Sequence, residues 1–145
     1  MYKSNEISHV HFEPTQRCQA LCPMCDRTHN PHIKNAEISV VQFKQIIDSN
    51  FAKQLNSFLM CGNHGDPMIA KDALDMYEWL RYNNKELYLH MTTNGGGRTD
   101  DWWREIAKVF GNHGKVTFSV DGLEDTNHLY RVNVSWDRVE NSMDV

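Results

Sequence analysis

Three of the four cysteines, Cys18, Cys22 and Cys25, fall within eight consecutive positions of the chain. Thiolates separated by three and then two residues can converge from a single loop onto one face of an iron-sulfur cube, because such clusters are held by cysteines at short spacings. This arrangement would leave the fourth iron without a protein ligand. The spacing therefore predicts a 4Fe-4S cluster with one iron open to a small molecule.

Other chemistry fits the same cysteines, and the spacing alone leaves it open. Zinc accepts mixed thiolate and imidazole ligands in four-coordinate sites, so the three thiolates could bind zinc together with His29, His32 or Cys61. Cys22 and Cys25 by themselves are spaced as a redox pair. The remaining alternative is a group of buried thiols that bind nothing.

The elements that must position this loop alternate regularly along the sequence. Four apolar runs predict buried strands, at Val10 and Phe12 with their neighbours and at residues 57–61, 87–93 and 116–120. Each run leads into a stretch with helical periodicity. We predict an α/β fold with a parallel sheet of four βα units, whose functional loops leave the C-terminal ends of the strands. No composition shift divides the chain, so residues 1–145 are predicted to form one domain.

Capping and breaking residues place the helices. Ser39 and Gln42 have the spacing of a capping box, and the helix that they start is predicted to bury Phe43, Ile46, Ile47 and Phe51. A second predicted helix begins at Asp72 and carries Leu74, Tyr77 and Leu80. A third ends at Gly111 and carries Trp103, Ile106, Ala107 and Phe110. The fourth begins at Ser135 and carries Trp136, Val139 and Met143.

Composition and charge argue against several classes of protein. With 40% apolar and 10% aromatic residues the chain can build a core, so we do not expect disorder. Its net charge of -4 leaves no positive excess for a phosphate backbone, which argues against nucleic acid as a partner. We find neither an apolar run long enough to span a membrane nor a hydrophobic export signal, and therefore expect a cytoplasmic protein.

Cys18, Cys22 and Cys25 stand in a CxxxCxxC motif that resembles the signature of the radical S-adenosylmethionine (radical SAM) superfamily. The resemblance implies a partial (β/α)6 barrel that lacks its last units. It implies a 4Fe-4S cluster and S-adenosylmethionine as cofactors, with a one-electron donor such as flavodoxin or ferredoxin. The implied activity is reductive cleavage of S-adenosylmethionine to a 5'-deoxyadenosyl radical, which abstracts hydrogen from a small-molecule or peptide substrate.

Further likenesses to the superfamily follow successive predicted strands. Gly65 and Asp66 resemble the end of a Gly-Gly-Glu-Pro motif that holds the amino group of S-adenosylmethionine, with Asp in place of Glu. Asn94 lies in a stretch similar to the common Thr-Asn-Gly turn. Ser119 and Asp121 resemble residues that contact the ribose. Read singly, each stretch is also an ordinary turn or cap.

The resemblance assigns less specific roles to four more residues. Arg131 is similar to an arginine near the cofactor carboxylate, although a solvated surface charge fits it too. Met24 occupies the position beside adenine, where a methionine that fills a core gap is the alternative. Cys61 could be a substrate-side thiol or a buried strand cysteine. His64 could be an acid or base at the mouth of the site or a solvated loop residue.

Residues 119–143 resemble the peptide- and protein-modifying branch that carries a cysteine-rich SPASM extension. Four βα units would leave an unpaired edge on the fourth strand, so the chain is a fragment, a naturally short form, or one whose barrel an oligomer or a partner chain completes. Two non-enzymatic interpretations stay open. One is a metal-binding module for zinc or an iron-sulfur cluster, and the other is a module that binds S-adenosylmethionine without cleaving it.

Overall fold

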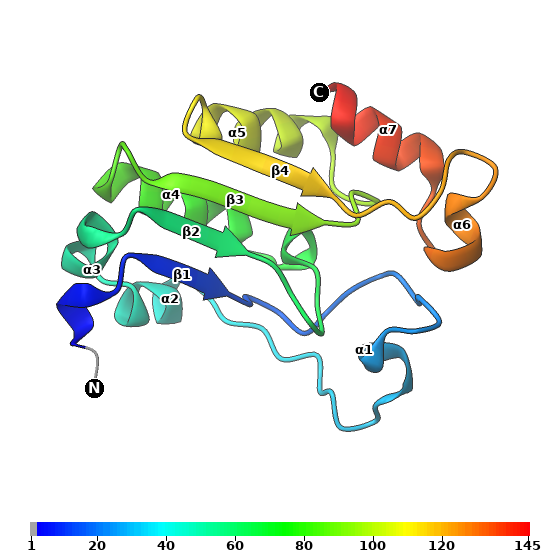
Figure 1. The fold of residues 1–145 in the computed structure, drawn as a ribbon, viewed down its shortest axis with the longest axis horizontal. Coiled ribbons are helices and arrows are strands. Elements are labelled where there is room, and N and C mark those ends of the chain that lie inside the picture. The colour runs from blue at the N-terminus through cyan, green and yellow to red at the C-terminus, as the bar shows by residue number, and fades with distance from the viewer. Residues whose placement is uncertain (1–2) are drawn as a thin grey trace.

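A four-stranded parallel sheet organises residues 3–145, the part of the chain that the computed structural model describes (Figure 1). Its strands lie in the order in which they occur in the sequence: β1 (His9–Phe12), β2 (Ser57–Met60), β3 (Tyr88–Thr93) and β4 (Gly114–Phe118). The α-helices are α1 (Asp26–His29), α2 (Val40–Ile46), α3 (Ser49–Gln54), α4 (Ala73–Asn83), α5 (Asp100–Phe110), α6 (Asn127–Tyr130) and α7 (Trp136–Asp144). Two 3₁₀ helices are η1 (Ser4–Glu6) and η2 (Pro67–Ile69). The predicted α/β fold with four parallel strands is confirmed.

The hydrophobic core lies between one face of the sheet and the helices. The central strands β2 and β3 contribute Phe58, Met60, Leu89 and Met91, all fully buried. Their register places Met60 beside Met91, so these side chains form a continuous apolar surface under the helices. Alternate residues of a strand point to opposite faces, which is why every second residue of β2 and β3 is buried.

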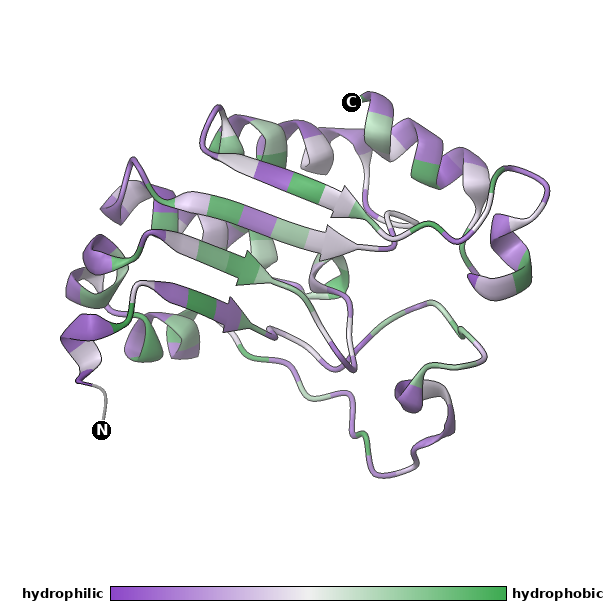
Figure 2. Cartoon of the chain, in the orientation of Figure 1, coloured by the Kyte–Doolittle hydropathy of each residue, from purple (hydrophilic) through white to green (hydrophobic). Residues whose placement is uncertain are grey.

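The opposite face of the sheet is mostly polar, with Leu59 of β2 as an apolar residue between His11 and His90. Figure 1 is seen from this side, and no helix of residues 3–145 crosses it, whereas α4 lies behind β2 and β3. The hydropathy colours in Figure 2 alternate along β1, β3 and β4, whereas β2 is hydrophobic from Phe58 to Met60. The side chains on this face include His9, His11, His90 and Thr117, and His90 pairs with the Thr117 hydroxyl at 2.9 Å.

The long helix predicted from Ser39 is wrong in one respect, because the chain turns at Ile47 and forms two short helices. Ser39 does cap α2 through the expected box with Gln42. The Asp48 carboxylate then accepts hydrogen bonds from the backbone amides at positions 50 and 51, at 2.9 and 2.8 Å, and starts α3. Aspartate is a strong N-cap, so a second helix start is favoured there. The turn leaves Ile46 58% exposed instead of buried.

Helices α4 and α5 follow the prediction closely. α4 begins after Asp72 and buries Tyr77 and Leu80, but the Asp72 carboxylate caps the first turn of α2 instead, accepting from the Val40 amide at 2.9 Å. α5 buries Trp103, Ile106 and Phe110 and ends at Gly111, whose φ of 51° suits a residue without a side chain. Ala107, predicted on the apolar face, is exposed.

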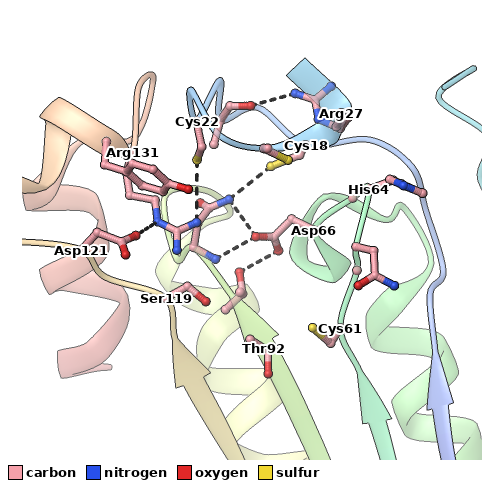
Figure 3. Close-up of a pocket in the computed structure, with 18 residues that line it drawn as sticks. Cys18, Cys22, Arg27, Cys61, His64, Asp66, Thr92, Ser119, Asp121 and Arg131 are labelled. Carbon is pink, nitrogen blue, oxygen red and sulfur yellow. Dashed lines mark hydrogen bonds and ion pairs between the residues drawn. The ribbon is translucent and has the colours of Figure 1, made fainter. Parts of the chain in front are cut away.

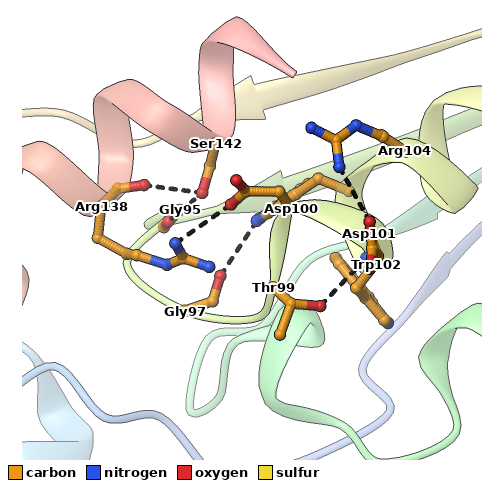
Figure 4. Close-up of polar contacts among 10 residues, drawn as sticks. Gly95, Gly97, Thr99, Asp100, Asp101, Trp102, Arg104, Arg138 and Ser142 are labelled. Atoms are coloured by element: carbon orange, nitrogen blue, oxygen red, sulfur yellow. Dashed lines mark hydrogen bonds and ion pairs between the residues drawn. The ribbon is translucent and has the colours of Figure 1, made fainter.

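Helix α7 begins after Ser135 as predicted and packs against the start of α5 and the loop after β3 (Figure 4). Val139 is fully buried, and the Ser142 hydroxyl donates to the Gly95 carbonyl at 3.0 Å. Arg138 pairs with Asp100 at 3.2 Å. Met143, predicted to face the core, is 43% exposed. Across residues 3–145, none of these helices is long and apolar enough to cross a membrane.

Candidate functional site

The C-terminal ends of the strands open into a cavity of about 340 Å³ (Figure 3). Its lining comes from the loop after β1, the loop after β2, the end of β3 with the loop that follows it, and the segment from the end of β4 to Arg131. The predicted site residues that line it are Cys18, Cys22, Cys25, Gly65, Asp66, Asn94, Ser119, Asp121 and Arg131. Residues that lie up to 113 positions apart in the sequence are therefore brought to one place by the parallel order of the strands.

Local hydrogen bonds shape the cysteine loop. The Cys25 amide donates to the Cys22 carbonyl at 3.1 Å, and the Thr28 hydroxyl donates to the same carbonyl at 3.0 Å. The Arg27 guanidinium donates to the Ala20 carbonyl at 2.8 Å and holds the start of the loop to its end. Cys22 is buried against a small second core with Val134 and Val139. The loop is thus anchored on the last helix of the chain.

Two of the three sulfurs have N–H donors directed at them. The Asn94 carboxamide donates to Cys18 Sγ at 3.5 Å, and Arg131 donates to Cys22 Sγ at 3.7 Å. Figure 3 shows Arg131 turned toward Cys22. All four cysteines are free thiols. Donors of this kind stabilise negative charge on sulfur, so the set fits a group held by thiolates, such as an iron-sulfur cluster. Within residues 3–145, no three His, Cys, Asp or Glu side chains form a site for a single metal ion.

Burial raises the pKa of the Cys18 thiol from 9.0 to about 11, and the neighbouring Asp66 carboxylate contributes to the rise. The folded protein therefore favours the protonated thiol. The contribution of Cys18 to the free energy of unfolding is fully present below the pKa of this thiol in the unfolded chain. It is lost as the pH rises through the pKa of the thiol in the folded protein. A bound metal would reverse this preference, because a coordinating thiol is deprotonated.

We expect Cys18 of the metal-free protein to react with iodoacetamide roughly 100-fold more slowly at neutral pH than an ordinary thiol, because the shift from 9.0 to about 11 lowers its thiolate fraction by that factor. Mass spectrometry of the alkylated peptide, followed as the pH rises, measures this directly. A reaction that reaches half its maximal rate near 9.0 instead of near 11 contradicts the expectation.

The loop after β2 passes very close to the chain that leads into the cysteine loop. A Cβ atom at Gly65 would lie 1.9 Å from the Thr15 carbonyl oxygen, so only glycine fits there. The Asp66 amide donates to the Arg17 carbonyl at 2.9 Å and holds the two segments together. The backbone around Gly65 is therefore fixed at the wall of the cavity, beside the cysteines.

The Asp66 carboxylate is buried, and four hydrogen bonds occupy its two oxygens. The donors are the Met68 amide at 3.0 Å, the Thr93 hydroxyl at 2.7 Å, and both the backbone and side-chain amides of Asn94 at 2.7 Å. Burial raises the pKa of Asp66, and these hydrogen bonds oppose the rise. A carboxylate has about four lone-pair sites, so all of them are used within the protein. A contact with the cofactor amino group would fall to the backbone of this loop.

Asp121 and Arg131 form an ion pair in which Arg131 Nε donates to Asp121 Oδ2. The guanidinium also lies 5.6 Å from the ring centre of Tyr130, which lines the same cavity. Only some of its five N–H groups are used by Asp121 and Cys22. Ser119, whose amide donates to the Thr93 carbonyl at 2.7 Å, presents its side chain to the cavity from the end of β4.

The structure separates Met24 from the other site residues. Met24 is 82% exposed and is not part of the cavity lining, so its place beside adenine stays a prediction. Cys61 and His64 do line the cavity. Burial raises the pKa of the Cys61 thiol. His64 Nε2 lies 3.4 Å from Asp26 Oδ2, which joins the loop after β2 to helix α1.

Sequence reasoning missed three residues that support the site. The Thr93 hydroxyl donates to the Asp66 carboxylate. Gln19 Nε2 donates to Asn94 Oδ1 at 2.6 Å. Arg27 secures the cysteine loop. Thr93 lies in the Thr-Asn-Gly stretch and Gln19 lies inside the cysteine motif. Their positions within motifs were the available signal, but nothing local reveals their distant partners.

A parallel sheet of sequential βα units, with loops from every strand end around one cavity, defines an incomplete α/β barrel with a cofactor-type site. The profile of the Radical SAM superfamily matches residues 12–145, and the chain belongs to that superfamily. A search of curated proteins found no match.

Solved structures share this fold. Native anSMEcpe with bound AdoMet superposes with a TM-score of 0.71 at 21% identity, covering 94% of this chain and 39% of that one. Streptococcus suis SuiB bound to S-adenosylmethionine gives a TM-score of 0.68 at 15% identity, covering 90% of this chain and 29% of that one. BtrN in complex with AdoMet and 2-DOIA gives 0.64 at 16% identity, covering 84% and 49%. The chain thus spans about two-fifths of anSMEcpe, and its barrel is partial.

Proposed function

We propose that this chain binds a 4Fe-4S cluster through Cys18, Cys22 and Cys25 and binds S-adenosylmethionine beside it. The observation that carries the proposal is the meeting of three free thiols with the loops of the other strands around one cavity. The cluster would supply one electron for cleavage of S-adenosylmethionine, which starts hydrogen abstraction from a substrate. The protein's part is to hold the cofactor and to exclude water.

Charged groups from the segment after β4 suit the polar ends of the cofactor. Arg131 keeps N–H donors beyond those used by Asp121 and Cys22, and an arginine binds a carboxylate well. We assign it to the methionine carboxylate. Asp121 has a second oxygen that can accept from the paired ribose hydroxyls, and Ser119 lies beside it in the lining.

The loops after β2 and β3 suit the amino end of the cofactor. Gly65 brings backbone close to the cavity without a side chain, and its carbonyl can accept from an ammonium group. Asp66 and Asn94 fix this backbone by their mutual hydrogen bonds. We therefore assign the amino group to the backbone near Gly65, with Asp66 and Asn94 holding the two loops in place.

We also propose that the substrate is a peptide. The structure of SuiB bound to the precursor peptide SuiA has the same fold over 90% of this chain, with a TM-score of 0.67. The likeness of residues 119–143 to peptide- and protein-modifying enzymes points in the same direction. We further propose that flavodoxin or ferredoxin donates the electron.

We also propose that a further segment or a partner chain completes the barrel. Strand β4 has a neighbour on one side only among the described residues, and an open strand edge favours pairing with another strand. Sedimentation of the purified protein, alone and mixed with candidate partners, measures whether such an assembly forms.

The function is tested by preparing the protein without oxygen, reconstituting it with iron and sulfide, and reducing it. We expect an electron paramagnetic resonance spectrum typical of a reduced 4Fe-4S cluster. Addition of S-adenosylmethionine should change that spectrum, because the cofactor would bind the iron that lacks a protein ligand. Formation of 5'-deoxyadenosine is then followed by mass spectrometry.

Each alternative gives a different result. A protein that binds zinc and takes up no cluster overturns the proposal and identifies a metal-binding module. A cluster whose spectrum responds to S-adenosylmethionine, with no 5'-deoxyadenosine formed in the presence of a strong reductant, identifies a binding module without cleavage activity.

A further inference from the structure

The side chain of Asn94 has a fixed orientation. Its Oδ1 accepts from the Gly96 amide at 2.9 Å, and its Nδ2 donates to the Asp66 carboxylate at 2.7 Å. A backbone amide can only donate and an ionised carboxylate can only accept, so both contacts require the same placement of oxygen and nitrogen. Asn94 is only 3% exposed, so water does not compete for these contacts. Its second Nδ2 hydrogen is therefore directed by the protein.

That second hydrogen lies between two acceptors, one of which is Cys18 Sγ. Asn94 Nδ2 lies 3.5 Å from Cys18 Sγ, with Gln19 Oε1 at 3.4 Å as a neighbouring acceptor. Asp66 Oδ2 accepts from Asn94, while Asp66 Oδ1 is held by the Thr93 hydroxyl and the Met68 amide, so the carboxylate cannot rotate away from Asn94. The result is a chain of contacts that runs from the buried side chains of Asp66 and Asn94 to Cys18, which is partly buried.

We propose that Asn94 raises the reduction potential of the cluster through its N–H contact with Cys18, and that Asp66 is the positioning residue that keeps this N–H directed at the sulfur. The inference rests on the proposed cluster function. Hydrogen bonds to cluster sulfurs are one determinant of the potential, because they stabilise the additional negative charge of the reduced state. Burial strengthens the contact by removing competing water.

The first test is Asn94→Ala, which removes the donor. We expect the equilibrium constant for one-electron reduction to fall by about tenfold, equivalent to a potential about 59 mV more negative. A redox titration followed by electron paramagnetic resonance, without S-adenosylmethionine, measures it. Asn83→Ala is the matched control, because Asn83 lies in α4 and its side chain donates to the Trp79 carbonyl within the same helix. We expect the control to keep the wild-type potential.

The second test is Asp66→Asn. The new side chain keeps one oxygen and cannot accept from all four donors, so the Asn94 Nδ2–H loses its charged acceptor. Loss of the Asp66 charge beside Cys18 acts on the potential in the opposite direction from loss of the Asn94 donor, so the positioning role is measured by hydrogen exchange and not by the potential. In the metal-free protein, nuclear magnetic resonance should show the Asn94 side-chain hydrogens exchanging with solvent at least about tenfold faster than in the wild type, since loss of a hydrogen bond to a charged group is of that order.

The outcomes separate this inference from the function on which it rests. An Asn94→Ala variant that holds a full cluster at the wild-type potential overturns the inference and leaves the proposed function intact. Unchanged exchange of the Asn94 hydrogens in Asp66→Asn overturns the positioning role of Asp66. A wild-type protein that takes up no cluster overturns both proposals. If Asp66→Asn fails to fold, Asn94→Ala decides the effect on the potential.

Discussion

We expect Cys22→Ala to abolish cluster binding and all cleavage of S-adenosylmethionine. This is the largest effect that we expect of any single substitution. Two thiolates cannot replace three in holding the cluster when its fourth iron has no protein ligand. Cys22 is also the most buried of the three, 6% exposed, so solvent offers no substitute ligand there. Iron and sulfide content, together with the electron paramagnetic resonance spectrum of the reduced protein, measures the loss.

Cys61→Ala is the matched control for this experiment. Cys61 lines the same cavity but lies at the end of β2, away from the cysteine loop. We expect the control to retain full iron and sulfide. A complete cluster and normal cofactor cleavage in Cys22→Ala would refute the ligand assignment. Loss of bound metal in Cys61→Ala would instead favour the four-ligand zinc site.

Gly65→Ala is expected to lower the free energy of unfolding by at least about 3 kcal/mol. The new Cβ would lie 1.9 Å from the Thr15 carbonyl oxygen and 2.7 Å from its carbon, and neither backbone atom can move without displacing the start of the cysteine loop. The substitution should therefore also weaken binding of S-adenosylmethionine. Urea unfolding and equilibrium binding of the cofactor measure the two effects.

Gly97→Ala separates a backbone clash from the general effect of replacing a glycine. The nearest atom to its new Cβ is the tip of the Met68 side chain at 3.0 Å, which can rotate away. We expect a change in the free energy of unfolding within about 1 kcal/mol. Equal losses in the two variants would show that the contact of Gly65 with Thr15 has no special importance.

Local patterns were sufficient to predict the strands, their parallel arrangement and the starts of the main helices. Phe58 and Leu89 lie in short apolar runs, and Ser39 and Ser135 mark helix starts recognisable from their immediate neighbours, although only Ser39 makes a side-chain cap. The prediction of a single helix through Ile47 was wrong, because it followed the helical spacing of the apolar residues and gave too little weight to Asp48 as a helix cap. Periodicity says which residues are apolar, but it does not say where the backbone turns.

The site was predictable as a set of loops and less so as a set of contacts. The cysteine spacing predicted three of the nine predicted site residues that line the cavity, and the resemblance to the radical SAM superfamily supplied the other six. Their partners were not accessible to sequence reasoning, because Asp66 and Asn94 lie 28 positions apart and each also has an ordinary structural explanation. For Met24 the motif suggested a contact with the cofactor that the fold does not yet support. Its side chain is 82% exposed to solvent.

The cysteine loop and the segment after α6 are joined by hydrogen bonds. The Leu21 amide donates to the Val132 carbonyl at 3.0 Å, and Arg131 reaches Cys22 across 109 positions of sequence. During synthesis the strands can pair one after another as they emerge, since each lies next to its predecessor. The cysteine loop gains its final anchor only after the segment beyond β4 has been made. A ribosome-bound chain that ends at β4 would therefore present the cysteines without the arginine that contacts them, and we expect maturation with iron and sulfide to follow synthesis of that segment.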